Sequence, residues 1–181
     1  MSPRRAVPLR RACSLAAALT ALAGCADAPT ATSRPAELRA SRAAGAAVER
    51  PWKGRCDVET VVTEFGPTGP VKFHQTGTCQ LAHLGRTTVV TDETFSPGTG
   101  TTAVTSTFTA ANGDRLYTTG IIRRSAIAPD GSVTLAGTYT AVGGTGRFAG
   151  ASGTAVFAET ARINPPAPTV GAYTLEGRLA Y

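Results

Sequence analysis

Hydrophobic and polar residues alternate in short runs from Trp52 to the end of the chain, and no stretch there has a helical period. Thr, Val, Ile, Phe and Tyr recur in these runs, and clusters of Gly, Pro, Asn and Asp separate them, as in tight turns. Because the connections are short, neighbouring strands are expected to be antiparallel. The pattern predicts eight strands: Cys56–Phe65, Val71–His83, Arg86–Phe95, Thr101–Ala110, Arg115–Ile127, Val133–Val142, Gly153–Ile163 and Val170–Tyr181.

Eight antiparallel strands in up-and-down order can close into a calycin-like barrel that leaves no exposed edge. The sequence therefore predicts an all-β, eight-stranded up-and-down β-barrel, with a β-sandwich as the alternative. The more apolar strand faces, which are expected to point inward, carry Leu116, Ile122, Val133, Leu135, Tyr139, Phe157, Tyr173, Leu175 and Leu179. The opposite faces lack the apolar band and aromatic girdles of a transmembrane barrel and carry Thr134, Thr138, Thr140, Thr154, Thr160, Thr174 and Arg178.

Residues 1–24 are typical of a secretory signal peptide, with a basic start and an apolar run too short to span a bilayer. The run ends in Leu22-Ala23-Gly24-Cys25, which resembles the lipobox of bacterial lipoproteins. This resemblance implies that Cys25 is lipidated and becomes the first residue after cleavage. Ala26 stands where many inner-membrane lipoproteins have Asp, which favours the outer membrane in a cell with two membranes. The alternative is an ordinary signal peptide with a cysteine there by chance.

Residues 25–51 are rich in Ala, Ser, Thr, Pro and Arg and contain no aromatic residue. Such a segment buries too little apolar surface to offset the entropy lost on ordering. We therefore expect a flexible, lipid-anchored linker over residues 25–51 and a β-barrel domain over residues 52–181. The protein is expected at the bacterial cell envelope, facing the periplasm or the cell surface.

The formal charge of +6 is concentrated in the predicted signal peptide, where Arg4, Arg5, Arg10 and Arg11 lie. Without these four residues, 14 of the 18 basic side chains remain against 12 acidic ones. The nearly balanced remainder contains no block of like charge, so no nucleic-acid partner is expected.

Two of the four cysteines remain in the expected mature domain, because Cys13 lies in the signal peptide and Cys25 in the lipobox. A hairpin centred between Pro67 and Thr68 would place Cys56 directly opposite Cys79. In an oxidising compartment this register predicts a disulfide across the first hairpin. A reactive thiol pair is the alternative.

The sequence Gly143-Gly144-Thr145-Gly146-Arg147-Phe148-Ala149-Gly150-Ala151-Ser152-Gly153 resembles the glycine-rich segment of the allene oxide cyclase and dirigent-type β-barrels. The likeness includes the hairpin Ala111-Asn112-Gly113-Asp114 and a final strand over Gly171–Tyr181. It implies an eight-stranded barrel, often trimeric, with an apolar cavity. In that family, plant enzymes cyclise a fatty-acid epoxide, and dirigent proteins steer the coupling of phenoxy radicals.

The glycines of this segment are expected to form a structural turn at Gly143, Gly144, Gly146, Gly150 and Gly153, with Phe148 as a plug at one end of the barrel. A phosphate-binding loop is the alternative, but it would need a Walker lysine or a Rossmann context, and the sequence has neither. The family's catalytic residues do not align with this chain, so no activity is carried over.

Polar residues on the inward faces are candidates for ligand binding. Glu159 shares a face with Phe157, and Arg124 shares a face with Ile122, so the two could anchor a carboxylate or polarise a carbonyl. The alternative places both at the barrel rims, with their charged ends in water. Tyr139, Phe157 and Tyr173 complete the candidate lining. His74 and His83 have no evident third ligand, so neither a metal nor a cofactor is expected.

Three classes of function fit these features. The first is a membrane-tethered binding or accessory protein whose barrel holds a small apolar ligand, without a recognisable catalytic motif. The second is a cyclase or isomerase similar to the allene oxide cyclases, and the third is a structural envelope lipoprotein with a packed barrel. The expected partners are a membrane through the N-terminal lipid, a small apolar ligand and, by the resemblance, two further copies in a homotrimer.

Overall fold

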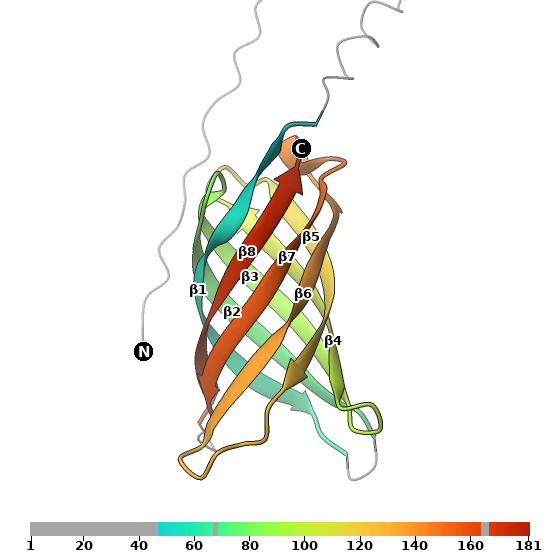
Figure 1. The fold of residues 1–181 in the computed structure, drawn as a ribbon, viewed down its shortest axis with the longest axis vertical. Coiled ribbons are helices and arrows are strands. Elements are labelled where there is room, and N and C mark those ends of the chain that lie inside the picture. Colours follow the sequence, from blue (N-terminus) through green and yellow to red (C-terminus); the bar gives the residue numbers. More distant parts are fainter. Residues whose placement is uncertain (1–46, 67–68, 164–166) are drawn as a thin grey trace, which may run out of the picture. The chain divides into compact units, whose positions relative to one another are not determined.

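The computed structural model describes residues 47–66, 69–163 and 167–181 as a closed barrel of eight strands. Each strand pairs antiparallel with its neighbours in the chain, and the last pairs with the first (Figure 1). This confirms the eight-stranded up-and-down β-barrel. The strands are β1 (Glu49–Glu64), β2 (Val71–Leu81), β3 (Gly85–Ser96), β4 (Thr101–Ala110), β5 (Arg115–Arg124), β6 (Ser132–Gly144), β7 (Ser152–Arg162) and β8 (Thr169–Ala180).

The predicted signal peptide, Cys25 and the linker up to residue 46 lie outside the described residues. No helix in the described part of the chain is long and apolar enough to cross a membrane.

The largest difference from the predicted strands is at β1, which begins at Glu49 rather than at Cys56. Its first residues pair with the end of β8, with Trp52 opposite Gly177. The side chain of Trp52 is fully buried and packs inside the barrel. Sequence alternation missed this part of the strand because Pro51 and Gly54 are unusual strand residues. Both fit here because pairing with β8 anchors the segment.

The disulfide between Cys56 and Cys79 is confirmed. In the hairpin of β1 and β2, Cys56 lies opposite Cys79, and Val58 lies opposite Gly77. The register predicted from the position of the turn is therefore the one observed between β1 and β2.

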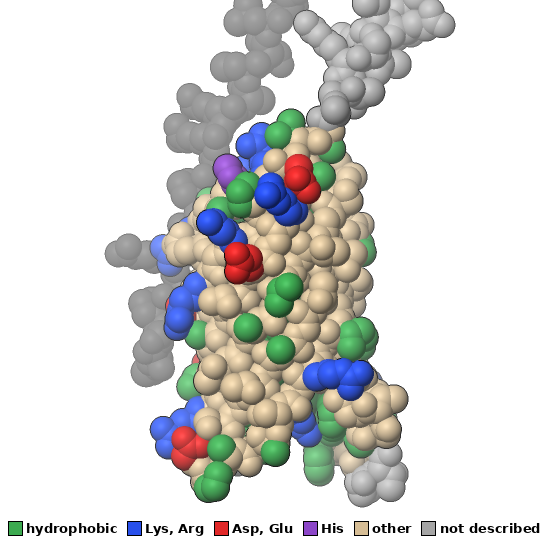
Figure 2. Space-filling model, viewed as in Figure 1, with side chains coloured by type: hydrophobic (Ala, Val, Ile, Leu, Met, Phe, Trp, Pro, Cys, Tyr) green, Lys and Arg blue, Asp and Glu red, His purple; other side chains and the backbone are tan. Residues whose placement is uncertain are grey.

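Alternation places the predicted apolar faces inside the barrel. Of the residues expected to point inward, all are buried except Leu135, which is partly buried. The Thr residues expected on the outside are exposed. Figure 2 shows few charged side chains over the middle of β6, β7 and β8, whose outer face is mainly Thr, Ala and Val.

Aromatic side chains fill the middle of the barrel. Trp52, Phe108, Tyr139 and Phe157 follow one another in edge-to-face contacts, with ring centroids 6.3, 6.4 and 5.3 Å apart. Tyr173 continues the series, 4.9 Å from Phe157. Such contacts add to the stabilisation from burial of the rings. This part of the lumen is packed, so any ligand site must lie toward an end.

Candidate functional site

The two ends of the barrel differ. At one end lie the start of β1, the end of β8 and the turn between β6 and β7 (Figure 1). The fully buried Phe148 closes this end, with its ring 4.9 Å from that of Tyr181. We call this the closed end. The opposite end, where β1 leads into β2 and β5 into β6, contains the cavity described below.

The glycine-rich segment forms the turn at the closed end as predicted, with a short 3-10 helix over Gly146–Phe148. Gly146 has a φ of +56°, and a Cβ atom there would collide with the carboxylate of Asp114. Arg147 donates its backbone N–H to the Asp114 carboxylate, and Arg115 donates its backbone N–H to the hydroxyl of Thr145. The β4–β5 hairpin and the glycine-rich turn therefore support each other.

A cavity of about 80 Å³ lies at the opposite end, which we call the mouth. Its apolar lining includes Val133, Leu135 and Ala161, and its polar lining includes Gln75, Glu93 and Glu159. A cavity that holds benzene measures about 150 Å³, so this one has room for a head group rather than a whole ring. A second hollow of about 290 Å³ adjoins it and shares Thr60, Ile163 and Thr169 with it.

Glu93 and Glu159 are the two charged residues buried in the mouth cavity, 8% and 6% exposed. Glu93 comes from β3 and Glu159 from β7. In the ring of strands, β4, β5 and β6 separate them on one side, and β8, β1 and β2 on the other. The two carboxyl groups therefore enter the lumen from opposite sides. Neither forms a salt bridge with any described residue.

Burial disfavours the charged form of both groups. Desolvation raises the pKa of Glu93 to about 7. Desolvation, followed by the negative charge of Glu93, raises the pKa of Glu159 to about 7, while a hydrogen bond from Gln75 acts in the opposite direction. Near neutral pH, a small change in the pH or in the charge nearby therefore changes the protonation of the pair.

Gln75, on β2, is the third buried polar residue of the cavity, and its side chain is only 2% exposed. Its Nε2 donates a hydrogen bond to Oγ1 of Thr60 over 3.1 Å. Its Oε1 is buried and accepts no hydrogen bond from the described residues. Leaving a buried acceptor without a hydrogen bond costs free energy. A hydrogen bond to this oxygen from a ligand or from water would therefore be favourable.

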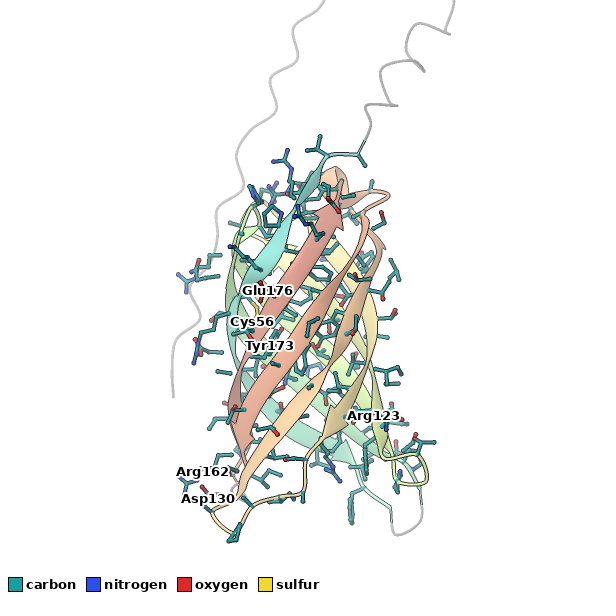
Figure 3. All side chains as sticks on the ribbon, in the orientation of Figure 1. Cys56, Arg123, Asp130, Arg162, Tyr173 and Glu176 are labelled. Atoms are coloured by element: carbon teal, nitrogen blue, oxygen red, sulfur yellow. A yellow bond between two sulfur atoms is a disulfide. The ribbon has the colours of Figure 1, made fainter. Side chains whose placement is uncertain are left out.

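Tyr139 and Tyr173 point into the lumen next to Phe157, but none of these three candidate ligand residues lines the mouth cavity. Burial raises the pKa of both phenols, so both remain neutral. Figure 3 shows Tyr173 near Cys56, and its hydroxyl lies 3.9 Å from Sγ of Cys79. These aromatic residues form the packed part of the lumen between the mouth cavity and the closed end.

Arg124 also lines the cavity, but it is exposed, and its guanidinium group lies 4.0 Å from the centre of the Phe95 ring. No ion pair between Arg124 and Glu159 forms among the described residues. Glu159 therefore points into the lumen, as in the first alternative, whereas Arg124 lies at the rim, as in the second.

Glu93 and Gln75 were not predicted from the sequence as site residues. Alternation along β3 places Glu93 on the same face as Val89 and Thr91, and this signal was available. Gln75 was harder to assign because its neighbours in β2 are polar on both faces. The convergence of three strands on one cavity depends on the closure and stagger of the barrel, which sequence alone does not give.

Among the described residues, no group of three or more His, Cys, Asp and Glu side chains could hold a metal ion. His74 pairs with Asp92 on the outer surface, with 2.8 Å between Nδ1 and Oδ1. His83 lies in the turn between β2 and β3, with a φ of +63°.

No protein-family model matches the chain, and no curated protein matches it. Among solved structures, the barrel is similar to a dirigent protein described as a pterocarpan synthase. The TM-score is 0.50 at 13% identity, over 74% of this chain and 86% of that chain. This similarity shows a shared dirigent-like barrel fold.

Proposed function

We propose that this protein is an exported, lipid-anchored barrel that binds a small, mainly apolar ligand at its mouth. The observation that carries the proposal is the contrast between the two parts of the lumen. The middle is packed with aromatic rings, whereas the mouth holds a cavity with apolar walls and buried polar groups. Ligand sites in proteins combine these two features.

The buried carboxyl groups argue against a purely structural barrel. Burying Glu93 and Glu159 without an ion-pair partner costs stability, and an apolar residue at either position would remove that cost. Groups of this kind are concentrated at functional sites. The adjoining hollow, lined by Val61, Val62 and Pro168, offers a surface for the part of the ligand that does not fit the cavity.

A cyclase or isomerase activity is the second candidate, and one observation favours it. Two carboxyl groups with pKa values of about 7 are suited to transferring protons near neutral pH. The dirigent-like fold and the resemblance of the glycine-rich segment support both candidates, since that family includes enzymes and proteins that guide reactions without catalysing the oxidation.

Binding at the mouth is tested with the full chain carrying Cys25→Ala, which removes the predicted lipid and the need for detergent. We expect benzyl alcohol, added as a small probe, to shift amide resonances of residues around the cavity. Ala161→Leu should fill the cavity and weaken binding by about tenfold, or about 1.4 kcal/mol. Ala158→Leu is the matched control, because Ala158 lies on the outer face of the same strand.

If neither benzyl alcohol nor its amine analogue benzylamine changes the resonances of the cavity, or if both variants bind benzyl alcohol equally, the mouth is not a ligand site. Native mass spectrometry of the same protein tests two further proposals. Extra mass that leaves on activation would reveal a bound ligand, and a mass of three chains would support the homotrimer. A bare monomer would instead favour the structural lipoprotein.

The lipid anchor is tested by export of the chain with and without Cys25→Ala. We expect the unchanged protein in the membrane fraction and the variant in the soluble envelope fraction, because several acyl chains hold a protein firmly on a bilayer. If the variant still fractionates with membranes, the lipobox assignment is wrong. β1 begins at the closed end of the barrel, opposite the mouth.

A further inference from the structure

The polar groups buried in the mouth cavity share one chemical property, which is that each can accept hydrogen bonds from a ligand. Glu93 and Glu159 offer carboxyl oxygens, and Gln75 offers its unpaired Oε1. The amide nitrogen of Gln75 carries two N–H groups; one donates to Thr60, and a hydrogen bond from Gln75 to Glu159 also lowers the pKa of that carboxyl group. The buried part of the site therefore lacks a free amide donor and carries acid groups on two sides.

The geometry brings these acceptors around one small volume. Glu93 and Glu159 enter from opposite strands of the ring, and Gln75 lies on β2, the neighbour of β3. Gly171 on β8 leaves space beside Glu159, because a Cβ atom at this position would lie 2.6 Å from Oε1 of Glu159. A side chain at position 171 would thus crowd the Glu159 carboxyl group, and glycine leaves room for it there.

The basic residue that lines the cavity does not neutralise the pair. Arg124 is exposed, its guanidinium group lies over the ring of Phe95, and neither buried carboxyl forms an ion pair with it. The titratable groups that face the two carboxyls from the surrounding strands are Tyr139 and Tyr173, which add no positive charge. When both carboxyls are ionised, the cavity is strongly negative.

We propose that the mouth cavity binds the protonated amine of a small amphiphilic ligand, held between Glu93, Glu159 and Oε1 of Gln75. This inference rests on the proposed function and specifies its ligand class. An ammonium group has three N–H donors, one for each acceptor, and its positive charge compensates the two carboxylates. The apolar body of the ligand lies along Val133, Leu135 and Ala161 and extends toward the adjoining hollow.

Other head groups fit the cavity less well. A carboxylate ligand would bring a third negative charge next to two buried acids. Like charges repel strongly inside a small cavity with little water. A neutral alcohol has one donor, so it leaves two acceptors unpaired and both carboxylates uncompensated. The cavity has room for a head group of this size but not for a second ring beside it.

The proposal is tested with three probes of nearly equal shape: benzylamine, benzyl alcohol and benzoate. Each is titrated into the full chain carrying Cys25→Ala at about pH 8, and the amide resonances of the cavity are followed. We expect benzylamine to bind roughly tenfold or more tightly than benzyl alcohol, because hydrogen bonds to charged groups are stronger than neutral ones. Benzoate should bind most weakly.

Single variants Glu93→Gln and Glu159→Gln keep the shape of the site and remove one charge each. We expect each to reduce the preference for benzylamine over benzyl alcohol by roughly tenfold, while the affinity for benzyl alcohol changes little. Glu176→Gln, on the exposed outer face of β8, is the matched control and should keep the preference. Lowering the pH to about 5.5 should weaken benzylamine binding to the unchanged site, because the carboxyls become protonated there.

The outcomes separate this inference from the proposed function. If benzyl alcohol and benzylamine bind with equal affinity at the cavity, the mouth is a ligand site but the amine inference is wrong. If benzylamine is preferred but neither Gln variant changes the preference, the amine does not lie between the two acids, and the inference is also wrong. If no probe binds, the proposed ligand site itself fails.

Discussion

Phe148→Ala is expected to lower the free energy of unfolding by about 3–5 kcal/mol, the usual cost of removing a buried phenylalanine ring. The ring is fully buried at the closed end, with Tyr181 on one side and the Arg147 guanidinium group 4.7 Å from its centre. The turn around it is held to the β4–β5 hairpin, because Arg147 donates its backbone N–H to Asp114 and the Thr145 hydroxyl accepts one from Arg115, so the turn cannot easily collapse into the space that the ring leaves. Most of the empty space left by the Phe148 ring should therefore persist.

The measurement is urea denaturation followed by circular dichroism, on the full chain carrying Cys25→Ala. Phe65→Ala is the control, because Phe65 is 78% exposed beyond the end of β1 and its loss should change stability little. Phe148→Leu should fall between the two, since it fills part of the space. A loss below about 1 kcal/mol for Phe148→Ala would show that Phe148 is not a plug that the barrel needs.

Glu93→Gln is expected to raise the free energy of unfolding at about pH 8 by about 3 kcal/mol. In the folded protein the pKa of Glu93 is about 7, against 4.5 for the unperturbed group. Below pH 4.5 both the folded and the unfolded chain hold the proton, so the group does not affect stability. Between 4.5 and 7 the unfolded chain releases the proton first, and stability falls as the pH rises.

The same reasoning applies to Glu159, whose pKa is also raised to about 7. We expect the unchanged protein to lose stability between about pH 4.5 and 7 and each Gln variant to lose less. Removing either acid also relieves the other of its repulsion, so the two effects are not additive. Glu176→Gln should follow the curve of the unchanged protein, and equal curves for all four proteins would contradict the burial of the carboxyl pair.

A gain in stability from removing these acids would itself bear on function. Proteins keep destabilising groups where activity or binding requires them. A ligand that compensates the two carboxylates would restore the lost stability in proportion to its affinity and concentration. Thermal unfolding with and without benzylamine would therefore report the same site as the binding titrations.

The sequence predicted the elements and their inner faces well because the signals are local. Alternation identified all eight strands, and the position of one turn gave the pairing of Cys56 with Cys79. The glycine-rich segment pointed to a turn with Phe148 as its plug, and the ring is fully buried there. Each of these features depends on residues close in the chain, or on a period of two along one strand.

The start of β1 and the identity of the site were decided only by the tertiary structure. Glu49 joins a strand because β8 lies beside it, although Pro51 and Gly54 argue against a strand locally. Alternation could suggest that Glu159 points inward, but not that Glu93 and Gln75 meet it across the lumen. That meeting depends on which residues of distant strands share one level of the barrel. Closure and stagger of the strands set those levels, and both arise from pairing along the whole ring rather than from any local stretch of sequence.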